Sequence, residues 1–136
     1  MQAFGNGIVA HGHINLTANP PAADVLRVMR IRAGTKVSAL MLGNSDMDTD
    51  GAPTFVFGIG YAPVVSADGP AASAAYFQAA GDTSFQAANA GKLYHNFAPI
   101  TFEKDVYLTM TVGTAAATFA AGSAYVTALG VARGIK

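Results

Sequence analysis

The stretch "VYLTMTVGTAAATFAAGSAYVTALGVA", Val106–Ala132, decides the fold, because it carries no charged residue and is long enough for either a membrane helix or strands. A helix that crosses a bilayer needs about 20 apolar residues, so length alone does not distinguish the two. The pattern does, since Leu108, Met110 and Val112 alternate with threonines. A period of two is typical of a strand with one buried face. The stretch therefore predicts β-strands and no membrane helix.

Similar short apolar segments recur along the chain, separated by glycine, proline, asparagine and aspartate residues, which favour turns. The expected strands are Ile8–Thr17, Val25–Arg32, Lys36–Leu42, Thr54–Val65, Lys92–Phe102, Asp105–Gly113 and Ser123–Arg133. We expect the second and third of these to form a hairpin around Gly34. About eight strands with turns every 8–12 residues or so predict an all-β, single-domain β-sandwich that is jelly-roll-like.

Two segments outside these strands differ from them in composition. The first seven residues, "MQAFGNG", are expected to form an N-terminal arm with Met1 and Phe4 as apolar anchors, and residues 8–136 the sandwich domain. The alanine-rich segment after Ser66 predicts a short helical insertion around residues 70–80, with Pro70 in its first turn.

One strand allows a finer prediction. Phe55, Phe57 and Ile59 share a face, so they should lie in the core. Gly58 and Gly60 alternate with them and indicate a bend or the close approach of another backbone.

The composition limits the function classes. Only 12% of the 136 residues are charged, about half the usual ~25%, and the formal net charge is zero. This predicts no nucleic-acid or membrane partner and favours a subunit of an assembly. Cysteine is absent, which excludes disulfides and thiolate chemistry. The N-terminus has no secretory signal, so we expect synthesis in a cytoplasm.

The aspartate run "DMDTDG" is the first candidate site. Asp46, Asp48 and Asp50 match the opening of a calcium loop, in which alternating carboxylates converge on one cation. The twelfth position should be a bidentate glutamate and is Phe57. We therefore interpret the run as a turn in which aspartates bond their own backbone, with no metal assigned.

Histidines form the second candidate. His11 and His13 are two apart, so on a strand both point to one face and resemble half of a cupin metal motif. That motif needs a nearby glutamate, and the only glutamate is Glu103. An exposed strand face or a subunit contact explains the pair better, and His95 is interpreted as structural.

Other chemistry has less support. No G-x-S-x-G elbow occurs, and no histidine pattern accompanies the serines Ser38, Ser45, Ser66 and Ser73. Arg27, Arg30 and Arg32 give one strand local positive charge, which either a partner's carboxylates or a solvated sheet edge would explain. No catalytic, cofactor-binding or metal-binding residue is predicted, and the protein is not expected to be an enzyme.

The order of the segments carries a resemblance. A strand ending "RIRAGTKV", the segment "GNSDMDTDGAPTFVFGIGYA", an alanine-rich insertion and a final "DVYLTMTVGTAAATFAAGSAYVTALGVARG" resemble small structural proteins of tailed-bacteriophage virions, most of all head decoration (cement) proteins. The resemblance covers Val25 to Arg133. It implies a β-sandwich, made in the host bacterial cytoplasm, that assembles as a homotrimer on the major capsid protein and stabilises the head lattice.

Two alternatives remain open. The first is a tail or head-to-tail connector component of the virion. The second is a glycan-binding jelly-roll module, although such sites usually stack sugars on aromatic rings and this chain has no tryptophan.

Overall fold

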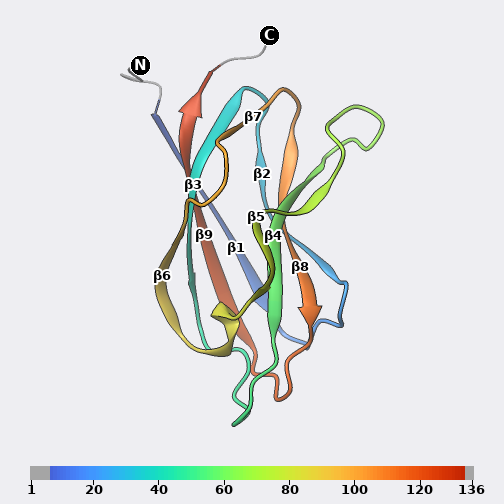
Figure 1. Ribbon diagram of the computed structural model, residues 1–136, viewed down its shortest axis with the longest axis vertical. Coiled ribbons are helices and arrows are strands. Elements are labelled where there is room, and N and C mark those ends of the chain that lie inside the picture. Colours follow the sequence, from blue (N-terminus) through green and yellow to red (C-terminus); the bar gives the residue numbers. More distant parts are fainter. Residues whose placement is uncertain (1–6, 134–136) are drawn as a thin grey trace.

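Nine strands in two antiparallel sheets make up residues 7–133, the part of the chain that the computed structural model describes (Figure 1). The strands are β1 (Gly7–Leu16), β2 (Val25–Ile31), β3 (Thr35–Asn44), β4 (Val56–Pro63), β5 (Ser73–Asp82), β6 (Asn89–Tyr94), β7 (Ile100–Phe102), β8 (Val106–Thr114) and β9 (Gly122–Ala132). A single 3-10 turn, η1 (Ser84–Gln86), lies between β5 and β6. The predicted arm, residues 1–7, lies outside the described residues except for Gly7. The all-β sandwich is confirmed.

The five-stranded sheet has the order β1-β9-β3-β6, and β7 also pairs with β3. The β6 and β7 strands share one edge of β3, since β6 pairs with Leu40–Asn44 and β7 with Thr35–Val37. The four-stranded sheet has the order β2-β8-β4-β5. Strands β8 and β9 come from the uncharged stretch at the end of the chain, so the prediction of strands there is confirmed. Among residues 7–133, no helix is long and apolar enough to cross a membrane.

The predicted hairpin is wrong, because β2 and β3 belong to different sheets. The turn between them does lie at Gly34, which has a φ of 84°. Its N–H donates to the carbonyl of Phe102 and its carbonyl accepts from the N–H of Arg133, so the turn is bonded to other elements. Both strands have buried apolar residues, and the turn carries the chain from one sheet across to the other.

The predicted helix at residues 70–80 is also wrong, because Ser73–Asp82 forms strand β5. Helix propensity is a weak preference that tertiary contacts override. Here the contact is with the glycine face of β4: a methyl group on Gly60 would lie 1.8 Å from the carbonyl oxygen of Ser73. Two register shifts in the β4–β5 pairing accompany this approach. The small side chains that suggest a helix instead let β5 lie against β4.

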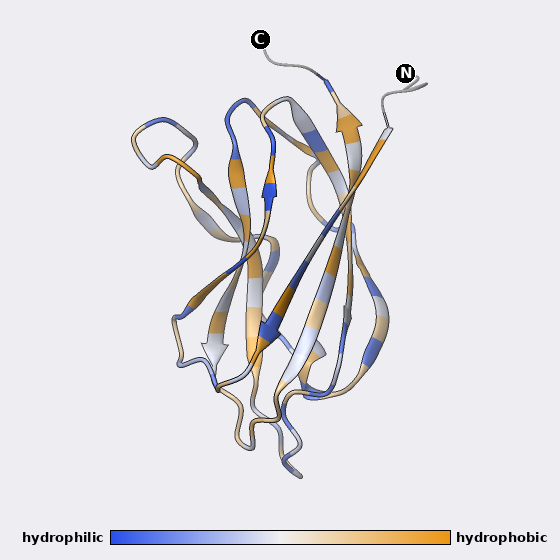
Figure 2. Ribbon diagram, turned by 180° about the vertical axis from the view of Figure 1, so that it is seen from behind, coloured by the Kyte–Doolittle hydropathy of each residue, from blue (hydrophilic) through white to orange (hydrophobic). Residues whose placement is uncertain are grey.

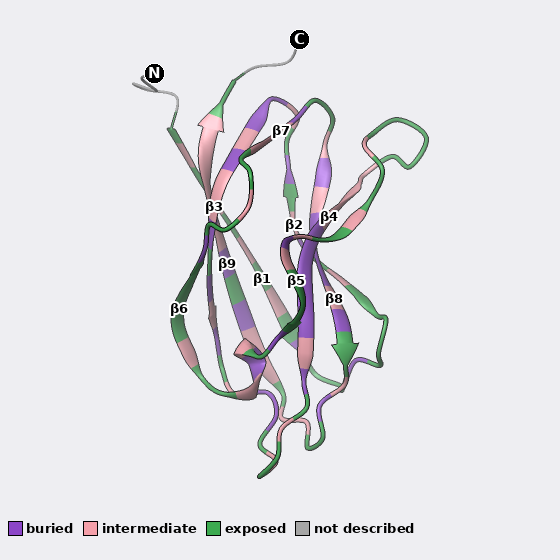
Figure 3. Cartoon of the chain, viewed as in Figure 1, coloured by how far each residue is buried: buried purple, intermediate pink, exposed green. Residues whose placement is uncertain are grey.

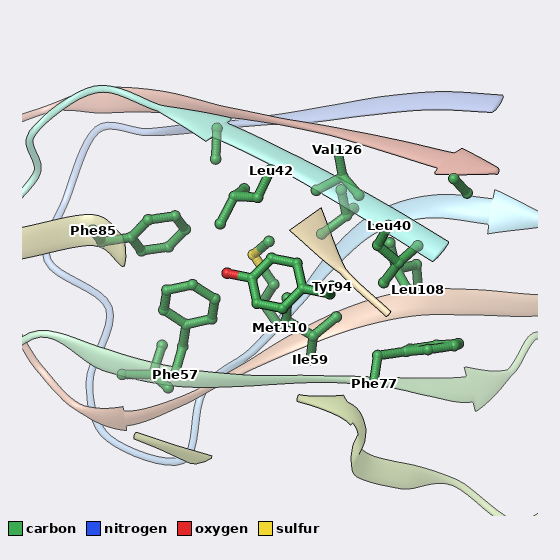
Figure 4. Close-up of a cluster of buried hydrophobic side chains, with 14 of the residues drawn as sticks. Leu40, Leu42, Phe57, Ile59, Phe77, Phe85, Tyr94, Leu108, Met110 and Val126 are labelled. Atoms are coloured by element: carbon green, nitrogen blue, oxygen red, sulfur yellow. The ribbon is translucent and has the colours of Figure 1, made fainter. Parts of the chain in front are cut away.

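The core lies between the two sheets, and strands of both contribute buried residues to it (Figure 3). Phe55, Phe57 and Ile59 are fully buried, as their shared face predicts. The Phe57 ring stacks on that of Phe85, with centroids 4.2 Å apart, and the Phe55 ring meets Phe85 edge-on at 5.2 Å. Figure 4 shows side chains from both sheets meeting in this core. Along the strands, hydrophobic positions alternate with polar ones (Figure 2).

A buried polar cluster joins β5 to β6, the edge strands of the two sheets. The Asp82 carboxylate accepts hydrogen bonds from Tyr94 Oη at 2.8 Å, Lys92 Nζ at 3.0 Å and the Ser84 N–H at 2.8 Å. Burial raises the pKa of Asp82, but hydrogen bonds from Ser84, Lys92 and Tyr94 outweigh it and lower the pKa below its usual value. Burial also raises the pKa of the Tyr94 hydroxyl. The cluster connects the two sheets on this side of the sandwich.

Candidate assembly surface

The aspartate loop lies at the end of the sandwich opposite to the start of β1 (Figure 1). Asp48 is buried, with 1% exposure. Its Oδ2 atom accepts the N–H groups of Thr54 (2.7 Å), Phe55 (3.0 Å) and Ala117 (3.1 Å), and its Oδ1 atom accepts that of Thr118 (3.0 Å). Burial raises the pKa of Asp48, but these four backbone donors outweigh it and hold the pKa well below its usual value. Asp48 therefore ties the loop before β4 to the loop between β8 and β9.

The neighbouring aspartates bond their own backbone. Asp46 accepts the N–H of Asp48 at 3.1 Å, and Asp50 accepts the N–H of Ala52 at 2.9 Å. The Ala52 N–H and the Thr118 hydroxyl lower the pKa of Asp50. Within residues 7–133, no three histidine or acidic side chains are grouped so that they could share a metal ion. The loop is thus built from aspartates that accept hydrogen bonds from backbone and hydroxyl groups.

The two histidines of β1 do share a face, as their spacing predicts. His11 and His13 are exposed and alternate with half-buried residues. His11 Nδ1 lies 3.0 Å from Thr127 Oγ1, and the His13 ring lies 6.1 Å from the Tyr125 ring. Glu103 is in an exposed turn after β7, on the other side of β9 and β3, so it does not approach the pair.

The remaining candidates are dispersed. His95 is exposed in the loop after β6. The serines occupy four separate places: Ser38 in β3, Ser45 after β3, Ser66 after β4 and Ser73 in β5. In the described chain, none of them has a hydrogen bond to a histidine, and Ser45 accepts one from the N–H of Ser123.

Arg27 and Arg30 lie in β2, which is an edge strand, and Arg32 follows directly after it. The Arg27 guanidinium lies 4.6 Å from the centre of the Tyr107 ring. Arg30 forms an ion pair with Asp105, donating from Nε at 2.9 Å. The N–H of Ala33 and the Arg30 guanidinium lower the pKa of Asp105. Two of the three arginines are therefore engaged within the chain.

The sequence analysis missed the outer face of the five-stranded sheet. Because paired residues point the same way, the ladder registers identify its members. The outer face includes Val9, His11, His13, Asn15, Ala39, Met41, Gly43, Leu93, Ser123, Tyr125, Thr127 and Leu129. Gly7, Lys36, Thr101 and Val131 continue it toward the end where β1 begins. Its exposed apolar residues come from four segments that are far apart in the sequence, so no single stretch of sequence indicates the face.

This outer face carries large exposed apolar side chains among uncharged polar ones and histidines, and it is nearly free of charge. Four of the six large apolar side chains that are exposed in the described chain belong to it: Val9, Met41, Leu93 and Tyr125. Among the described residues whose pairing places them on this face, Lys36 is the charged one, and it lies toward one end of the sheet. Strands β1, β3 and β9 have ten or eleven residues each, and β6 and β7 together form a fourth row, so the face covers roughly 600–650 Å². A standard interface buries about 800 Å² per partner, so this face is close to the required size.

Comparisons with known proteins agree with the predicted resemblance. No family model matches the sequence, and no curated protein matches it. A chain of the "Cyanophage Pam1 capsid asymmetric unit" is similar in structure, with a TM-score of 0.76 and 25% identity over 93% of this chain and 84% of that chain. A chain of the "Capsid of Ralstonia phage GP4" has a TM-score of 0.75 and 21% identity over 97% of this chain and 87% of that one. The fold is thus one that occurs in phage capsids.

Proposed function

We propose that this protein is a decoration, or cement, subunit of a tailed-phage head, without enzymatic activity. The observation that carries the proposal is the similarity, over 93% of the chain, to a chain of the Pam1 capsid asymmetric unit. The sites agree with a non-enzymatic role, because Asp48 and Asp50 are engaged in loop structure and the serines and histidines are dispersed. The protein would be made in the bacterial cytoplasm and reside in the virion.

The strand order supports a sandwich of the jelly-roll type. Successive strands alternate between the sheets from β1 to β4, and each sheet brings together strands from both halves of the chain. Eight of the nine strands form two four-stranded layers, β1-β9-β3-β6 and β2-β8-β4-β5, as an eight-stranded double-sheet architecture requires.

The proposed mechanism is geometric. The outer face of the five-stranded sheet lies against the major capsid protein, and protomers associate as a homotrimer, so that separating capsid subunits also requires exposing buried apolar surface. An uncharged face suits such a contact, because burying it leaves no unpaired charge. The predicted arm, residues 1–7, is the second adhesive element of the proposal.

A sedimentation experiment with undecorated heads tests the capsid contact. Val9→Glu and Leu93→Glu each place a charge on the outer face, whereas Val25→Glu places one on β2 at a residue of similar exposure, 52% against 60% for Val9. We expect the first two variants to lose at least tenfold in occupancy and the third to bind like the unmodified protein. Equal occupancy of all three would reject the outer face as the contact. Binding to tails instead of heads would favour the connector alternative.

A further inference from the structure

A cleft opens between the edge strands β1 and β2, near the end of the sandwich where β1 begins. It has a volume of about 400 Å³. Its apolar lining includes Ile8, Ala10, Ile31, Val37 and Ala128. Ile31 and Val37 are buried in the core, so the floor of the cleft is part of the core. An engineered cavity of about 150 Å³ holds a benzene molecule, so this cleft has room for an aromatic ring and more.

The walls of the cleft also offer backbone partners. Within residues 7–133, β1 pairs with β9 and β2 pairs with β8, and neither strand has a described partner along its other edge. The two strands touch at Gly12, where a methyl group would lie 2.6 Å from Met29 Cβ. Toward Gly7, the cleft lies between them. An extended segment can therefore form ladder hydrogen bonds there while its apolar side chains enter the cleft.

We propose that this cleft binds residues Met1–Asn6 of a second copy of the chain. The segment leaves the described structure at Gly7, next to Ile8 on the cleft wall. It contains two large apolar side chains, Met1 and Phe4, which suit the apolar lining of the cleft. Residues 134–136 offer a single one, Ile135.

The alternation of exposed and half-buried residues in β1 argues against insertion of the segment into its own cleft. A tight two-residue turn at Asn6-Gly7 would set Phe4 opposite Val9. A turn at Gly5-Asn6 instead would set Phe4 opposite Gly7. Gly7 belongs to the exposed series of β1 that includes Val9 and His11, whereas Ile8 and Ala10 face the cleft. A tight return would thus direct Phe4 to the wrong side of β1.

A head-to-tail contact of this kind closes into a ring of identical subunits when its rotation permits. The proposal therefore names the contact between protomers that the proposed function needs. It rests on that function only for its place in a phage head. Purified protein without capsids is sufficient to test it, so its failure is distinguishable from a failure of head binding.

The absence of cysteine makes disulfide trapping a clean test. Phe4→Cys protein carrying a mass tag is mixed with untagged Ala10→Cys protein and oxidised mildly. We expect disulfide-linked heterodimers, at least tenfold more than with the neighbouring outer-face variant His11→Cys. Equal yields would overturn the proposal. So would ring closure within one chain of the diluted Phe4→Cys/Ala10→Cys double variant, which would assign the segment to its own cleft.

Sedimentation equilibrium supplies the independent measurement. Deleting residues 1–6, or filling the cleft by Ala10→Leu, should raise the self-dissociation constant on the order of 100-fold, the effect of losing one buried aromatic side chain. An unchanged β-sheet circular dichroism spectrum and unfolding transition would show that the variants are folded. An unchanged dissociation constant, or a loss on deleting residues 134–136 instead, would overturn the assignment.

Discussion

Replacing Asp48 by asparagine tests whether one buried carboxylate holds the two loops at this end of the sandwich. The substitution keeps the size of the side chain and removes its charge. If the amide oxygen takes the place of Oδ2, it keeps the three donors Thr54, Phe55 and Ala117. The amide nitrogen then faces the N–H of Thr118 and the more distant N–H of Asp50, which lies 3.4 Å from Oδ1. Three charge-assisted bonds become neutral ones, and the Thr118 donor loses its partner together with the weaker Asp50 donor.

The magnitude follows from these changes. Hydrogen bonds to charged groups contribute about 1.5–3 kcal/mol, roughly twice the neutral value, and an unsatisfied buried donor costs about 1–3 kcal/mol. These terms add up to about 3–7 kcal/mol, and the neutral amide avoids part of the cost of burying a charge. The expected loss is therefore about 3–5 kcal/mol, a large part of the ~5–15 kcal/mol by which domains are usually stable. Asp46→Asn is the matched control, because Asp46 accepts a single backbone N–H, and it should cost about 1 kcal/mol or less.

Urea unfolding followed by circular dichroism measures the difference. With a slope of about 1.5–2 kcal/mol per molar, the midpoint of Asp48→Asn should fall by about 2 M, and that of Asp46→Asn by less than about 0.7 M. Equal, small shifts for the two variants would refute the role assigned to Asp48.

Three further predictions concern the core, a turn and metal dependence. Phe57→Ala should cost about 3–5 kcal/mol, because the ring is fully buried against Phe85; a loss below about 1 kcal/mol by urea titration would contradict that packing. Ala23 has a φ of 71°, so Ala23→Gly should stabilise by about 0.5–1 kcal/mol, whereas the control Ala22→Gly should destabilise by a similar amount; shifts of the same sign would argue against strain at Ala23. Chelator should leave the melting temperature unchanged, because the Asp48 oxygens are occupied by backbone donors; a drop that calcium restores would indicate a metal site.

Acid should destabilise the protein through the same carboxylate. The folded-state pKa of Asp48 is lowered, so its contribution is present above the unfolded pKa of about 3.9 and is lost as pH falls below it toward the folded value. Asp82 and Asp105 act in the same direction. The urea midpoint should therefore fall between pH 7 and pH 3, and fall less in Asp48→Asn. An equal fall in both proteins would point to other groups.

The strands were predictable wherever one face is buried, because alternation is a local signal. The Leu108, Met110 and Val112 series of β8 and the Phe57 and Ile59 series of β4 are of this kind, and both are buried in the core. Pairing partners were not predictable, because they depend on distant residues. Ser73–Asp82 is an example, since its conformation is set by contact with the glycine face of β4.

For the candidate sites, too, local features were predictable from the sequence and long-range contacts were not. The spacing of His11 and His13 predicts their shared face, and the aspartate run predicts its own turns. The main partners of Asp48 include Ala117 and Thr118, about 70 positions away, and no local pattern announces them. The outer face likewise could not be predicted, because it is formed by four strands whose pairing the sequence does not reveal.

The order of the strands also has a consequence for how the chain acquires its structure during synthesis. Strand β9 lies between β1 and β3, and strand β8 lies between β2 and β4, so one interior strand of each sheet is among the last two strands of the described chain to leave the ribosome. Until then, β1 and β3 have no strand to bridge them, and the nascent chain cannot close either layer. Folding must therefore wait for nearly the whole domain, as slow formation of long-range pairings implies. A chain that terminates before Val106 would lack both of these interior strands and be a substrate for proteases.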